Sequence, residues 1–560
     1  MDLKKTILKY ALQNAIKFNG KANPGAVIGK VFAENPSLKS KAKEVSKEVQ
    51  EIIKKINKIH IKEQLKQLQK LAPELLEKKE KEKKELPELP NAKGKVVTRI
   101  PPEPSKYNHI GHALSFLLNY LYAKKYNGKC ILRFEDTNPL TAKQEYVDAM
   151  KEDVLDYLDI KPDKIVFVSD DMHKFYKLAE QLIRKDKAYV CFCSREKMQE
   201  FRHKGKECDC RKKAISKNIE EWKNMLNKKY KEGECSLRLK IDMKAANHVM
   251  RDPVIMRLCY AEHYLQKKKY PVWPMYDFEN AIEEELCGIT HILRSSEFGS
   301  MRVELQDYIK DLFGFKKQTI VQYGRFNILG AITQGREIRK LIEEKKVVGW
   351  DDPRLVTLRA LRRRGIIKET FYELVLEVGL SKAETNLDWS RISSINRSIL
   401  DPKAYRYFFI TDPIEIKIEN APQQKLELDL HPDNKKGGRK FLTKDRFYIS
   451  SDDYKEFKEG KLYRLMDCLN FVKKNKKFVF DSLVVEIYRK KGDKIIHWLP
   501  KEKDLVKVEV LMPDAKIKKG LAEKTIKKLK VSDIIQFARF GFCRLDEIKG
   551  NEYKFWYTHD

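Results

Sequence analysis

The sequence has little of what marks secreted or membrane proteins. It contains 10 cysteines among 560 residues, too few for a disulfide scaffold of the kind that stabilises small extracellular domains. No run of about 18 apolar residues is present, the length that a helix needs to cross a bilayer. Residues 1–18 are amphipathic, with early lysines and no compact apolar segment. These absences predict a cytoplasmic protein that is not attached to a membrane.

Acidic residues are also scarce, because 82 Asp and Glu face 115 Lys and Arg and leave a formal net charge of +33. Hydrophobic residues make up 42% of the chain, enough to build folded cores. This charge favours an anionic macromolecular partner, nucleic acid first and an anionic membrane surface second, because neutralising phosphates releases counterions. A general lysine enrichment of the source proteome is the alternative explanation.

The length predicts about three to five domains, and the residue pattern changes along the chain. Residues 1–70 carry apolar side chains at helical spacing, whereas residues 77–90 hold ten charged side chains and two prolines, as is typical of a linker. From residue 95, short β-rich runs alternate with helical patterns, which predicts a parallel α/β sheet with its ligand crevice at the carboxyl ends of the strands. After residue 401, short β-rich runs predict an all-β region, a sandwich or a barrel.

These changes predict the limits of six segments. They are a helical module with a charged linker (1–91), the first half of the α/β domain (92–190), an insertion with a cysteine cluster (191–262), the second half of the α/β domain (263–325), a helical connecting domain (326–400) and the β region (401–560).

Two histidines three residues apart, His109 and His112, follow the first predicted strand and begin the next predicted helix. Residues at this spacing share one helical face, and a helix N-terminus attracts anions through its free backbone N–H groups and its dipole. The pair is therefore suited to donate hydrogen bonds to a triphosphate, and Gly111 would let a nucleotide approach the backbone closely. A chance pair of surface histidines is the alternative.

Four cysteines lie close together in the sequence. Cys191 and Cys193 form one C-x-C pair, Cys208 and Cys210 form another, and 14 residues separate the pairs. Four thiolates are the ligand number and type of a closed tetrahedral zinc site, although C-x-C is tighter than the usual C-x₂-C spacing. The cluster predicts a structural zinc ion, with four free thiols as the alternative.

Several ordered segments resemble the class I aminoacyl-tRNA synthetases, specifically the glutamyl and glutaminyl branch. The resemblance runs from about residue 95 to residue 560, and the helical N-terminal region is similar to the archaeal type. The segments are VTRIPPEPS (97–105), HIGH (109–112), LRFEDTNP (132–139), YDFEN (276–280), GITHILR (288–294), GWDDPRL (349–355) and LRALRRRG (358–365).

The resemblance implies a Rossmann catalytic domain with an inserted acceptor-stem-binding subdomain, a helical connecting domain and a β-barrel anticodon-binding region. It implies a monomeric ligase that uses ATP and Mg²⁺ to form glutamyl-AMP from L-glutamate and then transfers the glutamyl group to tRNA-Glu. Such chemistry depends on orientation and charge stabilisation more than on an acid or a base.

By the same resemblance, a set of five residues surrounds the amino acid substrate: Arg99, Glu135, Tyr276, Asn280 and Arg294. Arg294 offers a γ-carboxylate a charge-assisted pair, whereas the glutaminyl branch usually has a small uncharged residue there. Glutamate is therefore expected, with a glutaminyl-tRNA ligase as the alternative. Glu135 is expected to bind the substrate ammonium, and its alternative role is a structural ion pair with a neighbouring arginine.

Two positions depart from the family's motifs. The second signature loop aligns with residues 332–336, where Gly335 replaces the usual phosphate-binding lysine and Arg336 stays in register, and Lys106 replaces a glycine in the first signature. Either the chain is a tRNA-binding paralogue that lost adenylation, or Arg336, Lys340 or Lys106 supplies the missing charge. The expected catalytic and ATP-binding residues are His109, Gly111, His112, Lys106 and Arg336.

Basic and aromatic residues in the helical connecting domain and the β region complete the expected tRNA surface. Arg359, Arg362 and Arg363 share a predicted helix and are expected to bind the tRNA backbone, with a solvated helix face as the alternative. Phe537 and Trp556 lie among cations in the β region, which suits the stacking of unpaired anticodon bases. Core packing is the alternative for each aromatic residue.

Overall fold

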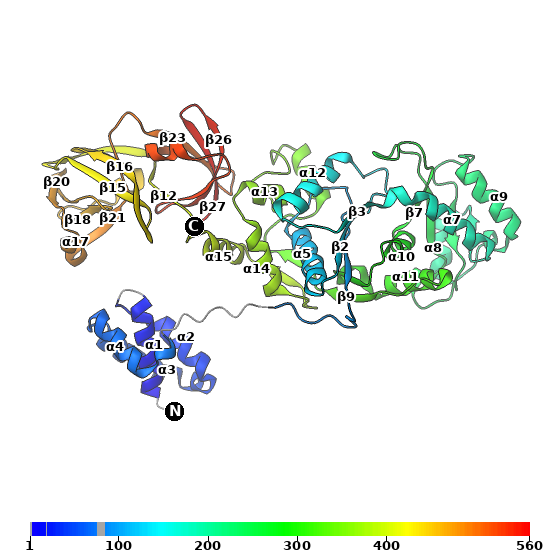
Figure 1. Cartoon of the computed structure of the whole chain (residues 1–560), viewed down its shortest axis with the longest axis horizontal. Coiled ribbons are helices and arrows are strands. Elements are labelled where there is room, and N and C mark those ends of the chain that lie inside the picture. Colours follow the sequence, from blue (N-terminus) through cyan, green and yellow to red (C-terminus); the bar gives the residue numbers. More distant parts are fainter. Residues whose placement is uncertain (1–2, 18–19, 76–84) are drawn as a thin grey trace. The chain divides into compact units, whose positions relative to one another are not determined.

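The computed structural model describes residues 3–17, 20–75 and 85–560 (Figure 1). The chain divides into two compact units, Met1–Glu85 and Leu86–Asp560. No helix in this described part of the chain is long and apolar enough to span a membrane. Most of the charged segment predicted as a linker lies outside the described residues, and the second unit begins several residues before the predicted boundary near residue 92.

The first unit is a small helical module, as predicted. One face of each helix is apolar, and these faces pack around a buried core that includes Ile7, Val27, Val49 and Leu68. Its helices are α1 (Leu3–Lys17), α2 (Pro24–Glu34), α3 (Ala42–Ile56) and α4 (Ile61–Leu71).

The second unit begins with the predicted parallel α/β sheet. Strands β1 (Val97–Ile100), β2 (Lys129–Phe134) and β3 (Lys164–Phe167) pair in that order, with α5 (Ile110–Lys125) and α6 (Gln144–Lys151) in the crossovers. A second parallel pair, β8 (His291–Ser295) and β9 (Thr319–Tyr323), flanks α11 (Gly299–Phe313). The Val97 amide donates to Thr290 Oγ1 (2.8 Å), which fixes β8 beside β1. The carboxyl ends of all these strands therefore meet at one edge.

An antiparallel subdomain interrupts the α/β unit between its two halves. Its four strands pair in the order β4 (Ala188–Cys191), β5 (Ser236–Leu239), β6 (Val254–Leu258) and β7 (Val272–Pro274). The predicted limits of the insertion, 191 and 262, lie inside this sheet. The helices around the sheet are α7 (Met172–Arg184), α8 (Arg195–Lys204), α9 (Ile215–Leu226) and α10 (Tyr276–Leu286).

A helical segment follows the catalytic sheet, as predicted. Its helices are α12 (Gly335–Glu343), α13 (Leu358–Arg363), α14 (Lys368–Val378) and α15 (Trp389–Leu400). A short parallel pair, β10 (Phe326–Ile328) and β11 (Thr385–Leu387), adds to them. Phe371 and Leu374 of α14 pack into the same core as α5, so this segment is built onto the catalytic domain.

The C-terminal region is all-β apart from two short helices, α16 (Ser451–Lys455) and α17 (Val485–Lys491). It contains two seven-stranded sheets and one hairpin. Aromatic residues fill one core around Trp498, and a second core surrounds Phe537 and Phe555. One sheet holds β12 (Arg406–Tyr407), β13 (Phe409–Thr411), β23 (Val506–Leu511), β24 (Ile517–Ala522), β25 (Ile534–Phe537), β26 (Gly541–Lys549) and β27 (Glu552–His559). The other holds β14 (Pro413–Glu419), β17 (Arg446–Ser450), β18 (Leu462–Leu465), β19 (Asn470–Lys474), β20 (Lys477–Ser482), β21 (Gly492–Ile496) and β22 (Leu499–Pro500), and β15 (Gln424–His431) and β16 (Asn434–Thr443) form the hairpin.

Candidate active site

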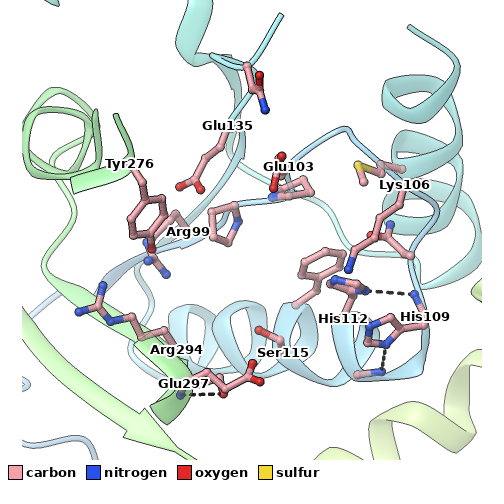
Figure 2. Close-up of a pocket in the computed structure, with 18 of the residues that line it drawn as sticks. Arg99, Glu103, Lys106, His109, His112, Ser115, Glu135, Tyr276, Arg294 and Glu297 are labelled. Carbon is pink, nitrogen blue, oxygen red and sulfur yellow. Dashed lines mark hydrogen bonds between the residues drawn. The ribbon is translucent and has the colours of Figure 1, made fainter. Parts of the chain in front are cut away.

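A cavity of about 610 Å³ opens at the carboxyl ends of the parallel strands. Its walls come from the residues that follow β1 and β2, from the ends of β8 and β9, and from the beginning of α5. A cavity of this size accommodates a nucleotide together with a small organic substrate. Figure 2 shows that polar side chains from these separate elements point toward one space.

The two signature histidines stand at the N-terminus of α5, on one side of this cavity. His109 is the N-cap residue, and its Nδ1 accepts a hydrogen bond from the Gly111 amide (3.1 Å). The His109 amide in turn donates to Nδ1 of His112 (3.1 Å), and the two rings lie 3.9 Å apart. Because both Nδ1 atoms accept, a neutral ring carries its hydrogen on Nε2. Each ring therefore keeps one N–H donor that the helix cap does not use.

Both histidines are uncharged at neutral pH. Burial, together with the positive charges of Lys106 and Arg325, lowers the pKa of His109 to about 3. Burial likewise lowers the pKa of His112 well below its usual value. The pair can thus donate hydrogen bonds to an anion but cannot neutralise its charge.

Gly111 has a packing role that the sequence did not reveal. A methyl group at this position would lie 2.9 Å from Cε1 and 3.1 Å from Nδ1 of His109. Glycine therefore leaves the space into which the His109 ring folds to cap the helix.

The opposite side of the cavity holds the residues predicted to surround an amino acid. Arg99, Glu135, Tyr276 and Arg294 all line it, as Figure 2 shows. Arg294 is 4% exposed, and its Nη1 donates to Oε1 of Gln306 (3.1 Å). Asn280 is buried behind the wall rather than in it. The sequence did not identify Gln306, because its segment carries no motif that distinguishes it from any other polar residue on a helix.

Asn280 belongs to a buried charge network beneath the cavity. Its Oδ1 accepts from Arg133 Nη2 (3.3 Å), which also contacts Glu135 (2.9 Å) and Glu284 (3.1 Å). Glu284 accepts a further hydrogen bond from Arg99 Nε (2.9 Å). The structural ion pair considered for Glu135 is thus present, although Glu135 also faces the cavity. The i, i+4 spacing of Asn280 and Glu284 on α10 was the available signal for this network.

The charge state of the network follows from its geometry. Burial acts to raise the pKa of Glu284, but the charges of Arg133 and Arg99 prevail and hold it at about 2. Glu284 is therefore ionised, and it anchors two arginine side chains at the floor of the cavity. Arg99 is held in place by this ion pair and by the Leu293 carbonyl (3.4 Å).

Of the two cations predicted to bind ATP, only one lies at the cavity. Lys106 lines the cavity close to the histidines, whereas Arg336 is exposed on α12 and does not line it. Gly335 is buried directly beside the Lys106 side chain. Arg325, which the sequence reasoning missed, also lines the cavity and pairs with Glu297 (2.8 Å).

Comparison with known proteins agrees with this geometry. Residues 95–402 match the family model of the catalytic domain of class I tRNA synthetases (E and Q), and residues 404–489 and 495–546 match its two anti-codon binding domain models. The chain belongs to this synthetase family. It is 43% identical to a glutamate–tRNA ligase of Pyrococcus abyssi, 43% identical to one of Pyrococcus horikoshii and 42% identical to one of Methanocaldococcus jannaschii, with 100% of both chains covered in each case.

The arginines that were expected to bind tRNA are already paired in this synthetase. Arg359 donates to the Tyr107 hydroxyl (3.1 Å), and Arg362 pairs with Glu152 (2.7 Å). Arg363 reaches both Asp351 and Asp546 at 2.6 Å, which ties α13 to strand β26 of the anticodon-binding region. These contacts hold elements of the synthetase together, and the contact of the three arginines with tRNA stays a prediction.

The two aromatic residues considered for anticodon stacking lie in the protein interior. Phe537 is fully buried in a β-region core, and Trp556 is 6% exposed beneath the guanidinium of Arg363 (4.3 Å). Both residues therefore pack in the protein core, which was the alternative interpretation.

The four cysteines of the insertion converge into one cluster. Their sulfur atoms all lie within 4.8 Å of one another, and the Cys191 and Cys208 sulfurs are 3.8 Å apart. Zn–S bonds of about 2.3 Å in a tetrahedron place sulfur atoms about 3.8 Å from one another. The Cys191–Cys208 distance thus matches the edge of a zinc–thiolate tetrahedron, and all four sulfurs lie within about 1 Å of that spacing.

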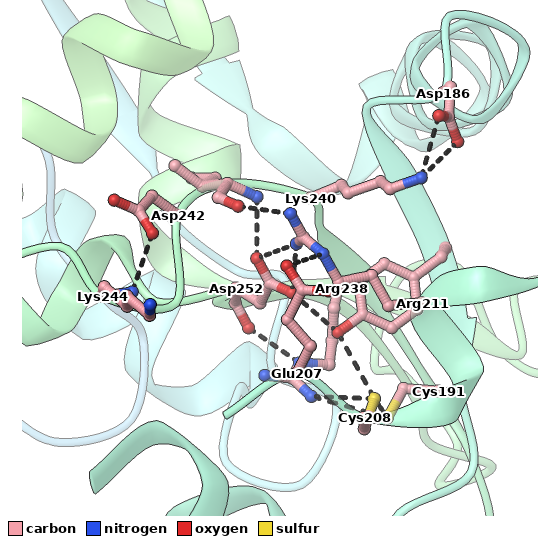
Figure 3. A network of polar contacts seen from close by, with 12 residues as sticks. Asp186, Cys191, Glu207, Cys208, Arg211, Arg238, Lys240, Asp242, Lys244 and Asp252 are labelled. Carbon is pink, nitrogen blue, oxygen red and sulfur yellow. Dashed lines mark hydrogen bonds and ion pairs between the residues drawn. The ribbon is translucent and has the colours of Figure 1, made fainter. Parts of the chain in front are cut away.

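The surroundings of the cluster also suit thiolates. The Phe192 amide donates to Cys210 Sγ (3.5 Å), and Arg238 Nη1 lies 3.5 Å from Cys191 Sγ. Figure 3 shows that Arg238, Arg211 and Asp252 form one polar network beside the cysteines, in which Arg211 pairs with Asp252 at 2.6 Å. Donors of this kind orient metal-bound thiolates and offset their negative charge.

Proposed function

We propose that this synthetase attaches L-glutamate to tRNA-Glu in two ATP-dependent steps. The observation that carries the proposal is a single cavity with Arg294 on one side and the two neutral histidines on the other. The full-length identity to glutamate–tRNA ligases supports the same activity. The cavity therefore holds the groups needed to bind a dicarboxylic amino acid next to a nucleotide.

In the first step, a carboxylate oxygen of glutamate attacks the α-phosphorus of ATP, which forms glutamyl-AMP and releases pyrophosphate. The Nε2–H groups of His109 and His112 would donate to phosphate oxygens on which charge builds up. Magnesium enters with ATP and supplies further phosphate charge neutralisation. In the second step, a ribose hydroxyl of the tRNA terminus attacks the glutamyl carbonyl, which forms the ester and releases AMP and a proton.

Selection of glutamate rests on Arg294. Its guanidinium is buried and oriented by Gln306, which itself donates to Asp277 Oδ1 (3.0 Å). A γ-carboxylate would offer this guanidinium two charged acceptor oxygens, whereas a γ-amide offers one neutral acceptor oxygen and an NH₂ group that cannot accept from it. Glu135, which lines the cavity on the same side as Arg99 and Tyr276, is the carboxylate proposed to bind the substrate ammonium.

The test is aminoacylation of tRNA-Glu with ATP, magnesium and radiolabelled glutamate, run beside radiolabelled glutamine. We expect charging with glutamate only, and Arg294→Cys should lower kcat/KM for glutamate by about 100-fold or more. Arg184→Cys, at an arginine 61% exposed on α7 that pairs with Glu180, is the matched control. Charging with glutamine alone would identify a glutaminyl enzyme, and tRNA binding without charging would identify a non-catalytic paralogue.

The remaining ligands and the setting are proposed on the same basis. The basic chain and the anticodon-binding domains support tRNA-Glu as the nucleic acid partner, with Arg359, Arg362 and Arg363 near its backbone. The cysteine cluster is proposed to hold one structural zinc ion through Cys191, Cys193, Cys208 and Cys210. The protein is proposed to act as a cytoplasmic monomer.

A further inference from the structure

Lys106 and Gly335 come from segments 229 residues apart in the chain, one before α5 and one at the start of α12, yet they are in direct contact. A methyl group on Gly335 would lie 2.8 Å from Cδ and 3.2 Å from Cβ of Lys106. The backbone of Gly335 is not in the left-handed region that favours glycine. Any side chain at position 335 would press on the stem of Lys106, and glycine leaves the space that this stem fills.

The Lys106 ammonium has no hydrogen-bond or ion-pair partner among residues 3–17, 20–75 and 85–560. It lines the same cavity as the two histidines, and Figure 2 shows it reaching toward them. The carboxylates of Glu103 and Glu297 and the guanidiniums of Arg325 and Arg339 are the other charges that act on it. A partly buried cation without a partner is unfavourable unless an anion arrives to pair with it.

The other cations near this end of the cavity are less suited to that anion. Arg325 is engaged with Glu297 at 2.8 Å. Arg339 is exposed and donates to the Ser105 carbonyl (3.1 Å), and Arg336 is exposed outside the cavity. Since both histidines are neutral, Lys106 is the cation placed to neutralise a phosphate beside them.

We propose that Lys106 binds the phosphates of ATP during adenylation and that Gly335 exists to admit its side chain. The two positions are then coupled: Lys106, before α5, carries the positive charge, and Gly335, at the start of α12, leaves room for the lysine side chain. A lysine at position 335 would occupy the space that Lys106 now fills, so only one of the two positions can carry the long side chain. This inference rests on the proposed function and assigns the residue that meets the phosphates.

The experiment compares four variants of the full-length protein: Lys106→Met, Lys106→Gly, Gly335→Lys and the double variant Lys106→Gly with Gly335→Lys. Lys161→Met removes a lysine that is 81% exposed and serves as the control. For each variant we would measure kcat and the KM values for ATP and glutamate in aminoacylation. Binding of ATP by calorimetry and of tRNA by filter retention would be measured separately.

We expect Lys106→Met to reduce kcat/KM for ATP by about 100-fold, while KM for glutamate and the affinity for tRNA change less than about threefold. The double variant should be more active than either Lys106→Gly or Gly335→Lys, because it restores one long cation and one open position. Wild-type rates in Lys106→Met, or a double variant no better than Lys106→Gly, would overturn the inference.

Calorimetry separates this inference from the proposed function. If the unmodified protein failed to charge tRNA yet bound ATP, the ligase proposal would fail, whereas a loss of ATP affinity in Lys106→Met would still support phosphate binding by Lys106. Unchanged ATP affinity in that variant would contradict phosphate binding whatever the activity. Lys106→Arg retains the charge and should keep more ATP affinity than Lys106→Met, which covers the case that Lys106→Met misfolds.

Discussion

At the scale of single residues, different side chains of the candidate active site supply hydrogen-bond donors and positive charge. His109 and His112 use Nδ1 to build the helix cap and are held neutral by burial, so they act as oriented donors. Positive charge is placed instead on buried arginines and on the partly buried Lys106. With this division, the proposed binding of a triphosphate would not depend on the protonation of an imidazole.

The residue with the largest expected effect on stability is Glu284. Replacing it with Gln would leave Arg99 and Arg133 without their shared carboxylate in a buried site, and we expect a loss of about 3 to 5 kcal/mol. Thermal unfolding at pH 7 would measure it, with Glu285→Gln, a change at a less buried position of the same helix, as the control. Similar melting temperatures for the two variants would show that the network contributes little.

The same carboxylate predicts a pH dependence. Its pKa in the folded protein is about 2, below the usual value of 4.5, so its stabilisation is fully present above about pH 4.5 and is lost as the pH falls toward 2. The shift corresponds to about 3 kcal/mol. The stability of Glu284→Gln should therefore fall less steeply than that of the wild type over this range. Parallel curves for the two proteins would contradict the ionised state of Glu284.

At the scale of elements, the cysteine cluster brings the end of strand β4 together with the loop between α8 and α9. Cys191 ends β4, and Cys208 and Cys210 lie in the loop between α8 and α9. A metal ion held by all four thiols would close this loop onto the strand, which removes conformational freedom from the unfolded chain. The cluster is thus expected to stabilise the insertion rather than to take part in catalysis.

This expectation is tested by metal analysis of the purified protein. We expect about one zinc ion per chain, loss of that zinc in Cys208→Ser, and a lower temperature for the unfolding of the insertion in that variant. Cys287→Ser, which changes a thiol at the end of α10 outside the cluster, should retain the zinc. A metal-free wild-type protein with four reactive thiols would establish the alternative of free cysteines.

The sequence predicted the order of elements well but not the contacts between distant segments. Alternation of β-rich and helical runs located β1, α5, β2 and β3, because period and turn residues are local properties. The contact between Lys106 and Gly335, the buried position of Arg133 and the pairing of Arg363 with Asp546 depend on tertiary packing. The family resemblance implied a common pocket for Arg99, Glu135 and Arg294, which do line one cavity, but it did not place Asn280 behind the wall or Arg336 outside it.

At the scale of the whole molecule, the net charge of +33 arises from lysines and arginines throughout the chain and not mainly from the few arginines of α13. The three predicted tRNA contacts are engaged in internal pairs, so much of the attraction for tRNA must come from the many other surface lysines and arginines. Attraction of this kind accelerates association and weakens with added salt.

The division of the chain into two units depends on where residues 86–90 belong. Leu86 and Leu89 are 7% and 6% exposed and pack into the core around α5, and the Leu89 amide donates to the Tyr126 hydroxyl (2.8 Å). The Pro90 carbonyl lies 3.1 Å from His291 Nε2, beside β8. This short segment is therefore part of the catalytic unit and not of a linker.

Two truncations that differ by six residues test this assignment. Removal of residues 1–85 should leave kcat and the KM for glutamate within about twofold of the full chain, because the helical module has its own core. Removal of residues 1–91 also deletes Leu86 and Leu89, and the loss of two buried leucines at about 2 to 5 kcal/mol each should lower the melting temperature by roughly 4 to 10 °C. Equal melting temperatures would show that residues 86–90 contribute nothing to the catalytic core, and an insoluble 86–560 fragment would show that the helical module is needed for folding.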